Sequence, residues 1–254
     1  MDANDAVVYD TSDDPFTVKG RVQLDSPNGG NILTVATPFN VNGSVFGPIA
    51  QVKLFYSTNG GATYENPMNG CETVAVSGGS FSCNWSVPDI IGTTVRVKVE
   101  DANNSLVNDA SAANFSVKGS ASLIAPTTGN IWIAGTSNNI VWDRTGTIGN
   151  VDLLYSVNNG TYNSIASGVP SPTVTGNSYP WTLPSDAIVS PNVKVKITGE
   201  NLVNEAVSPA FTVKGSLALT YPTAAGITRV LGDTMNVTWS VAVLVIVFHA
   251  VPSK

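Results

Sequence analysis

The chain has 254 residues, of which 43 % are hydrophobic and only 12 % are charged, and its formal net charge is -6. This balance predicts a packed globular chain and excludes a disordered one. The net acidity, without any block of like charges, also excludes the basic footprint of nucleic-acid binding, and no apolar run reaches the roughly 18 residues that a membrane span needs.

The segment 1–20 ends in Phe-Thr-Val-Lys-Gly. This phrase recurs as Phe-Ser-Val-Lys-Gly at 115–119 and as Phe-Thr-Val-Lys-Gly at 211–215. A phrase shared at the spacing of a whole module is the signature of a tandem repeat. We therefore expect residues 1–20 to be the last strand or strands of a partial module.

Residues 21–119 and 120–215 are predicted to be two complete modules. Each reads as about seven short strands with apolar-polar alternation between turn signals, and neither contains a convincing helix. Val95–Val99 in the first module matches Val193–Ile197 in the second. Alternate side chains of such strands face the core and the solvent, so the Val and Ile residues are predicted to be buried.

Residues 216–254 begin a third copy, because Pro222 and Trp239 match Pro126 and Trp142. The apolar run 241–248 then loses the alternation, so this segment is expected to supply only the opening strands of a partial module. Three explanations of the unusual ends stay open: a cut from a longer chain, a frame error in the last residues, or strand donation between chains.

The matched residues resemble those of fibronectin-III-like and bacterial immunoglobulin-like repeat modules of secreted or surface proteins. Trp142 lies late in the second strand, Leu153 and Tyr155 belong to an apolar-Tyr third strand, and Val193–Ile197 is a strongly alternating sixth strand. The resemblance implies an all-β fold of tandem antiparallel β-sandwiches with partial modules at both ends. Because these are packing motifs, it implies a fold and not a chemistry.

The two cysteines, Cys71 and Cys83, flank the turn at 77–79. Pairing the flanking strands about residue 77 places the cysteines opposite each other, within reach of a disulfide bond. We predict this disulfide and, with it, an extracellular or cell-surface location. The alternative is two free thiols in a reducing cell. A structural zinc site is not expected, because it needs four ligands.

Catalysis is not expected either. The only histidine, His249, lies outside both complete modules, so neither can hold a Ser-His-Asp or Cys-His arrangement. Paired carboxylates would suffice for a glycosidase, but the loop acids read as solvated turn residues: Asp101, Asp109, Glu200 and Glu205. The sequence therefore predicts no catalytic, cofactor-binding or metal-ligating residue.

Calcium at a module junction is the one cofactor that stays open. Five acidic residues crowd the segment before the first junction, and Ca²⁺ binds clustered carboxylate and carbonyl oxygens. They are Asp2, Asp5, Asp10, Asp13 and Asp14.

Trp132 is the best candidate for an exposed aromatic side chain facing a ligand, because it has no aromatic counterpart in the first module. The other tryptophans recur at matching positions or on core-phase strands and are predicted to be buried. They are Trp85, Trp142, Trp181 and Trp239.

Two functions follow as hypotheses. The first is a non-catalytic structural spacer in a large extracellular or cell-surface repeat protein, whose partners are the neighbouring modules of the same chain. The second is a set of adhesive or carbohydrate-binding accessory modules of a secreted protein or hydrolase, with a glycan or protein ligand. Neither involves nucleic acid or membrane insertion by this segment.

Overall fold

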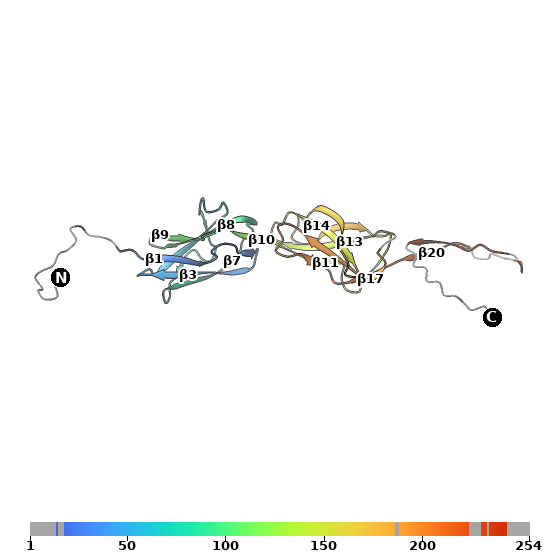
Figure 1. Ribbon diagram of the computed structural model, residues 1–254, viewed down its shortest axis with the longest axis horizontal. Coiled ribbons are helices and arrows are strands. Elements are labelled where there is room, and N and C mark those ends of the chain that lie inside the picture. Colours follow the sequence, from blue (N-terminus) through green and yellow to red (C-terminus); the bar gives the residue numbers. More distant parts are fainter. Residues whose placement is uncertain (1–13, 15–17, 186–187, 224–229, 233, 243–254) are drawn as a thin grey trace, which may run out of the picture. The chain divides into compact units, whose positions relative to one another are not determined.

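The computed structural model describes residues 14, 18–185, 188–223, 230–232 and 234–242. None of these residues is helical, which confirms the all-β prediction, and they include no helix that could cross a membrane. The chain divides into two compact units, and β-sandwiches occur in tandem along it, as predicted (Figure 1).

The first sandwich combines a small sheet with a large one. The small sheet has the order β1-β3-β7; the large sheet has the order β2-β10-β8-β4-β5, with β6 also paired to β4 and β9 to β8. Its residues favour strands because β-branched and aromatic side chains alternate with polar ones. The strands are β1 (Arg21–Ser26), β2 (Ile32–Thr34), β3 (Pro38–Phe46), β4 (Gln51–Ser57), β5 (Asn66–Pro67), β6 (Val74–Ala75), β7 (Ser80–Ser86), β8 (Gly92–Asp101), β9 (Asn104–Ala110) and β10 (Phe115–Lys118).

The second sandwich repeats this topology. Its small sheet has the order β11-β13-β16, and its large sheet has the order β12-β19-β17-β14-β15, with β18 also paired to β17. The strands are β11 (Ser120–Ala125), β12 (Ile131–Ile133), β13 (Ser137–Thr145), β14 (Asn150–Val157), β15 (Asn163–Pro170), β16 (Asn177–Thr182), β17 (Ser190–Thr198), β18 (Ala206–Val207) and β19 (Phe211–Lys214).

A strand pair of the second sandwich departs from the antiparallel expectation. β12 runs parallel to β19, with Ile131 opposite Thr212. The chain leaves β11 at Pro126 and turns through residues 127–130, where the Asn130 N–H donates to the Thr127 carbonyl. This bend moves the continuation of the first strand from the small sheet to the edge of the large one.

The predicted core strands are confirmed. The inward side chains of β8 and β17 are buried, as are three of the tryptophans predicted to be internal. Each such aliphatic side chain contributes about 1.5–3 kcal/mol through burial. These residues are Val95, Val97 and Val99 on β8, Val193, Val195 and Ile197 on β17, and Trp85, Trp142 and Trp181.

Each core contains one large aromatic ring at an equivalent pair of facing residues, but the ring comes from a different strand of the pair in each sandwich. In the first sandwich Gly43 on β3 lies opposite Phe81 on β7, and a Cβ built on Gly43 would lie 2.6 Å from ring carbons of Phe81. In the second, Trp142 on β13 lies opposite the small Asn177 on β16. The aromatic volume therefore comes from the edge strand in one module and from the central strand in the other.

In each module a buried serine hydroxyl accepts a hydrogen bond from a strand of the large sheet. The sequence pattern gave no indication of this serine. The Val97 N–H donates to Ser111 Oγ at 3.0 Å, and the Val195 N–H donates to Ser208 Oγ at 2.9 Å. The serine N–H returns a hydrogen bond to the carbonyl of the same valine in both modules. The serine hydroxyl thus satisfies a backbone donor that lies in the core.

We expect Ser208→Ala to lower the free energy of unfolding of the second sandwich by about 2 kcal/mol, because it leaves the buried Val195 N–H without its acceptor. Urea unfolding of the full chain measures this change. Ser164→Ala, at an exposed position of β15, should stay within about 0.5 kcal/mol of the parent chain. Equal effects of the two substitutions would contradict the role of the serine.

The third copy is described only as a strand pair, β20 (Ser216–Tyr221) with β21 (Thr238–Ala242). Leu219 lies opposite Trp239, as Leu123 lies opposite Trp142 in the second sandwich. The prediction that Trp239 is buried is wrong: it is 54 % exposed, since no second sheet covers this pair in the described part of the chain. Most of the run 241–248 lies outside the described residues.

Candidate functional site

Cys71 and Cys83 form a disulfide with a Cα–Cα distance of 6.0 Å, as predicted. The predicted strand pairing that places them opposite each other is wrong, however, since the turn between them is closed only by a bridge between Ser77 and Ser80. β6 pairs with β4, where Val74 lies opposite Val52, and does not pair with β7. The disulfide therefore joins the β5–β6 connection of the large sheet to the edge strand β7 of the small sheet.

The disulfide closes one side of the first sandwich. The connection between β5 and β6 turns inward, and the Cys71 N–H donates to the Met68 carbonyl at 2.8 Å. The side chains of Met68 and Cys71 are both completely buried. This short segment fills the gap between the edge strands of the two sheets.

The same side of the second sandwich is open. Tyr179 on β16 takes the position of Cys83 on β7, because Tyr179 lies opposite Ile140 as Cys83 lies opposite Val41. A groove of about 680 Å³ runs between β15 and β16. It is lined by Ala166, Ser167, Gly168, Val169, Pro170, Pro172, Thr173, Gly176, Asn177, Ser178 and Tyr179.

Two acidic residues of the first sandwich accept hydrogen bonds from backbone N–H groups. Asp101 accepts a hydrogen bond from the Asn103 N–H at 3.0 Å, and Asp109 accepts one from the Leu24 N–H at 2.8 Å. Asp101 therefore stabilises the β8–β9 turn, as predicted. The prediction that Asp109 is a solvated turn residue is wrong, because Asp109 lies on β9 and its carboxylate bonds to the backbone of β1.

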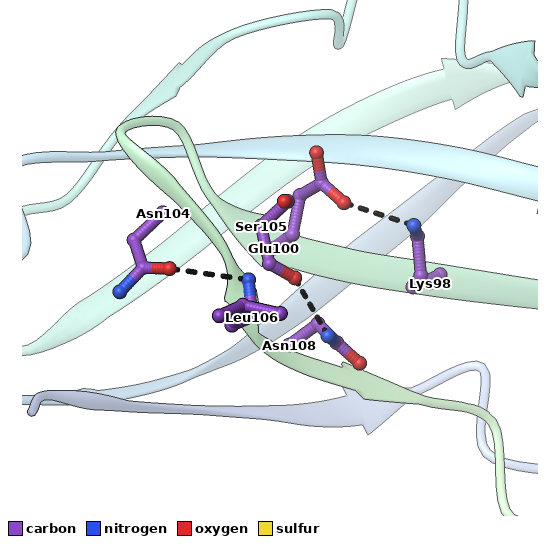
Figure 2. Close-up of polar contacts among 6 residues, drawn as sticks. All are labelled: Lys98, Glu100, Asn104, Ser105, Leu106 and Asn108. Atoms are coloured by element: carbon purple, nitrogen blue, oxygen red, sulfur yellow. Dashed lines mark hydrogen bonds and ion pairs between the residues drawn. The ribbon is translucent and has the colours of Figure 1, made fainter.

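Side-chain amides make local hydrogen bonds along β9, next to the β8–β9 turn (Figure 2). Asn104 Oδ1 accepts a hydrogen bond from the Leu106 N–H at 3.2 Å, and Asn108 Nδ2 donates to the Ser105 carbonyl at 2.7 Å. Both bonds are local, as Asn side chains favour in turns. These amides therefore stabilise the backbone of β9.

Lys98 forms an ion pair with Glu100 at 2.9 Å on β8 (Figure 2). Its ammonium also lies 5.0 Å from the ring centroid of Phe55 and 5.6 Å from that of Tyr64, within cation–π distance. Burial raises the pKa of the Tyr64 hydroxyl above its ordinary value, and the charge of Arg96 partly opposes this. Tyr64 therefore stays protonated at neutral pH.

The second sandwich repeats this arrangement. Lys196 pairs with Glu205 at 3.0 Å and lies 4.2 Å from the ring centroid of Tyr162. In both modules, therefore, a lysine that is itself paired lies within cation–π distance of an aromatic ring.

Trp132 does not offer an exposed ring, so the expectation of a ligand-facing aromatic there is wrong. Trp132 is 8 % exposed and packs against Phe211 and Trp181, with centroid distances of 4.7 and 6.1 Å. Its neighbour Ile131 faces outward instead. The matching residue of the first sandwich, Leu33 on β2, is buried in the same way.

The calcium hypothesis falls largely outside the described residues. Asp2, Asp5, Asp10 and Asp13 are not among them, and Asp14 is exposed. Within the part of the chain that the structure describes, no group of three or more His, Cys, Asp or Glu residues could hold a metal ion.

No family model matches this chain. A search of curated proteins finds no match either.

Solved structures of tandem modules resemble it. The fibronectin(III)-like modules of Clostridium thermocellum CbhA are 15 % identical with a TM-score of 0.25, covering 76 % of this chain and 94 % of theirs. The titin I-band fragment I67–I69 is 11 % identical with a TM-score of 0.40, covering 77 % and 65 %. Rst D1-D2 is 10 % identical with a TM-score of 0.36, covering 76 % and 100 %.

These similarities are low, so the assignment to sandwiches of the immunoglobulin-like and fibronectin-III-like class rests on the strand order of the chain itself. The open groove of the second sandwich escaped the sequence analysis. The connections after β4 and β14 differ in sequence, because the first carries Met68 and Cys71, whereas Ile165 and Tyr179 pack against the core of the second sandwich.

Proposed function

We propose that the chain is a non-catalytic spacer segment of a large extracellular or cell-surface repeat protein. The observation that carries the proposal is the length of the junctions. β10 ends at Lys118 and β11 begins at Ser120, and β19 ends at Lys214 and β20 begins at Ser216. A junction of one residue is too short to act as a free tether, so it restricts the movement of consecutive modules.

The chemistry of the described side chains supports the same proposal. The carboxylates Asp101, Asp109 and Glu205 are engaged in hydrogen bonds or ion pairs that hold the fold. The Cys71–Cys83 disulfide suits an oxidising compartment.

Carbohydrate binding is the rival function, and it needs exposed aromatic rings. Within the two complete sandwiches Trp132 is internal, the Phe55, Tyr64 and Tyr162 rings lie within cation–π distance of a lysine ammonium, and the exposed Phe46 ring lies 4.1 Å from the Arg21 guanidinium. The exposed Trp239 ring belongs to the strand pair of the third copy. We therefore favour the spacer.

The spacer proposal predicts that a flexible insertion at Gly119 changes the reach of the chain. A Gly/Ser linker of about ten residues has a root-mean-square span of about 17 Å. Small-angle scattering of the full chain should show a broader distance distribution after insertion at this position, because the restricted junction becomes a free tether.

The same linker inserted between Gly78 and Gly79 is the matched control, since this turn lies within the first sandwich. It should leave the long distances unchanged. If insertion at Gly119 has no larger effect than the control, the junction is already flexible and the spacer proposal is wrong.

A further inference from the structure

The chain carries five Asn-Gly dipeptides, which begin at Asn28, Asn42, Asn59, Asn69 and Asn159. At such a dipeptide the backbone nitrogen of the glycine can attack the side-chain amide carbon of the asparagine. Glycine permits this attack because it has no Cβ to obstruct the approach. A hydrogen bond that holds either reacting group must break first, so the fold decides which of the five sites can react.

Three of the five sites are held by one hydrogen bond or by strand pairing. The Asn28 Oδ1 accepts a hydrogen bond from the Ala112 N–H at 2.7 Å. Asn42 lies within β3, and its backbone is paired with β1 on one side and with β7 on the other. At the last site the Gly160 N–H, which carries the attacking nitrogen, donates to the Val157 carbonyl at 2.9 Å.

Asn59 is held at both reacting groups. Its Oδ1 accepts hydrogen bonds from the Ser57 hydroxyl at 2.7 Å and from the Thr63 N–H at 3.1 Å. The attacking nitrogen is also held, because the Gly60 N–H donates to the Thr94 carbonyl at 2.8 Å. This site is therefore protected on two sides at once.

Asn69 is the exception. The Cys71 N–H donates to the Met68 carbonyl at 2.8 Å, and Gly70 has a φ of 79°, so residues 68–71 form a type II turn with Asn69 and Gly70 at its centre. Both central residues are exposed. Among the described residues, neither the Asn69 side chain nor the Gly70 N–H has a hydrogen-bond partner. The attack at Asn69 therefore has no such bond to break.

We propose that Asn69 is a site of spontaneous deamidation in the folded chain, with water as the co-reactant. The Gly70 nitrogen loses its proton to solvent base and bonds to the side-chain carbon of Asn69, and the amide nitrogen leaves as ammonia. Water then adds to either carbonyl carbon of the resulting cyclic imide and breaks the bond of that carbon to the Gly70 nitrogen, which takes up a proton. Aspartate forms when the side-chain bond breaks, and isoaspartate forms when the main-chain bond breaks.

Isoaspartate lengthens the backbone where the first sandwich is closed. Residue 69 lies between Met68 and Cys71, whose side chains are completely buried, and the disulfide fixes Cys71 to Cys83. A methylene group inserted into the backbone between these two buried side chains disrupts the turn and its hydrogen bond from Cys71 to Met68. Deamidation at Asn69 therefore loosens the packing of Met68 as the protein ages.

The test is incubation of the full, oxidised chain in mildly alkaline water enriched in heavy oxygen, followed by peptide mapping with fragmentation that separates aspartate from isoaspartate. Incorporated heavy oxygen marks each site that reacts. We expect Asn69 to react at least about tenfold faster than Asn28 and Asn59, because each hydrogen bond that must break first raises the barrier. In the reduced, denatured chain the three sites should react at similar rates, since no fold protects them.

Asn69→Gln is the matched variant, because its longer side chain closes a larger ring more slowly. It should remove the early product and leave the rates at Asn28 and Asn59 unchanged. Hydrogen exchange at residues 66–75 should become faster in the aged parent chain and stay unchanged in the aged variant. The proposal is overturned if Asn28 or Asn59 reacts as fast as Asn69 in the folded chain, or if Asn69 keeps the same lead after denaturation. If isoaspartate forms without faster exchange at residues 66–75, the effect on Met68 is wrong.

Discussion

Trp142→Gly is expected to lower the free energy of unfolding of the second sandwich by about 4 kcal/mol and to leave the first sandwich unchanged. The Trp142 side chain is completely buried, and its indole N–H donates to Ser171 Oγ at 2.9 Å. Removing it opens a large cavity opposite Asn177, which is too small to fill the space. Hydrogen exchange detected by mass spectrometry measures the two sandwiches separately in the same sample.

The combination Trp142→Gly with Asn177→Phe recreates the Gly43–Phe81 pair of the first sandwich and is the test of the mechanism. We expect it to recover about 2 kcal/mol, with the rest lost because Asn177 no longer bonds to Thr173. If the double variant is less stable than the single one, the two pairs are not equivalent solutions of one packing problem.

Replacing both Cys71 and Cys83 by Ala is expected to destabilise the first sandwich by about 3 kcal/mol. The disulfide closes a loop of sequence separation 12, and its loss frees the unfolded chain. For a domain of this size the melting temperature should fall by about 15 °C. Differential scanning calorimetry of the full chain measures this change as the shift of one of two transitions.

The second sandwich is the internal control, since it contains no cysteine. Its transition should stay in place in the double variant and in the reduced parent chain. A shift of both transitions by the same amount would show that the two sandwiches unfold as one cooperative unit.

The central strands could be predicted from sequence because their β-branched residues alternate over five positions. Val193–Ile197 shows this pattern, and it assigns each side chain to one face without ambiguity. The three-residue strand β12 does not, because Ile131, Trp132 and Ile133 are all apolar. Periodicity cannot tell which of them faces inward. Trp132 was expected on the surface because it has no aromatic counterpart in the first module, but its counterpart Leu33 is an aliphatic core residue.

The disulfide could be predicted, but its surroundings could not. Cys71 and Cys83 are close along the chain, which favours their pairing. The partner of the strand that follows Cys71 is decided by Val74, which lies opposite Val52 on β4. That choice depends on a residue distant in sequence. The groove beside Ala166 was missed for a related reason: it lies between two edge strands that belong to different sheets.

Neighbouring modules of similar sequence are prone to exchange strands while they fold, which is a common route to misassembly in tandem arrays. The large aromatic ring lies on the edge strand β7 in the first core and on the central strand β13 in the second, and this difference opposes such exchange. If β3 paired with β16, Gly43 would face Asn177 and leave a void; if β13 paired with β7, Trp142 would face Phe81 and two rings would compete for one space. Strands therefore pack best with the other strands of their own sandwich, and the array can fold one module at a time.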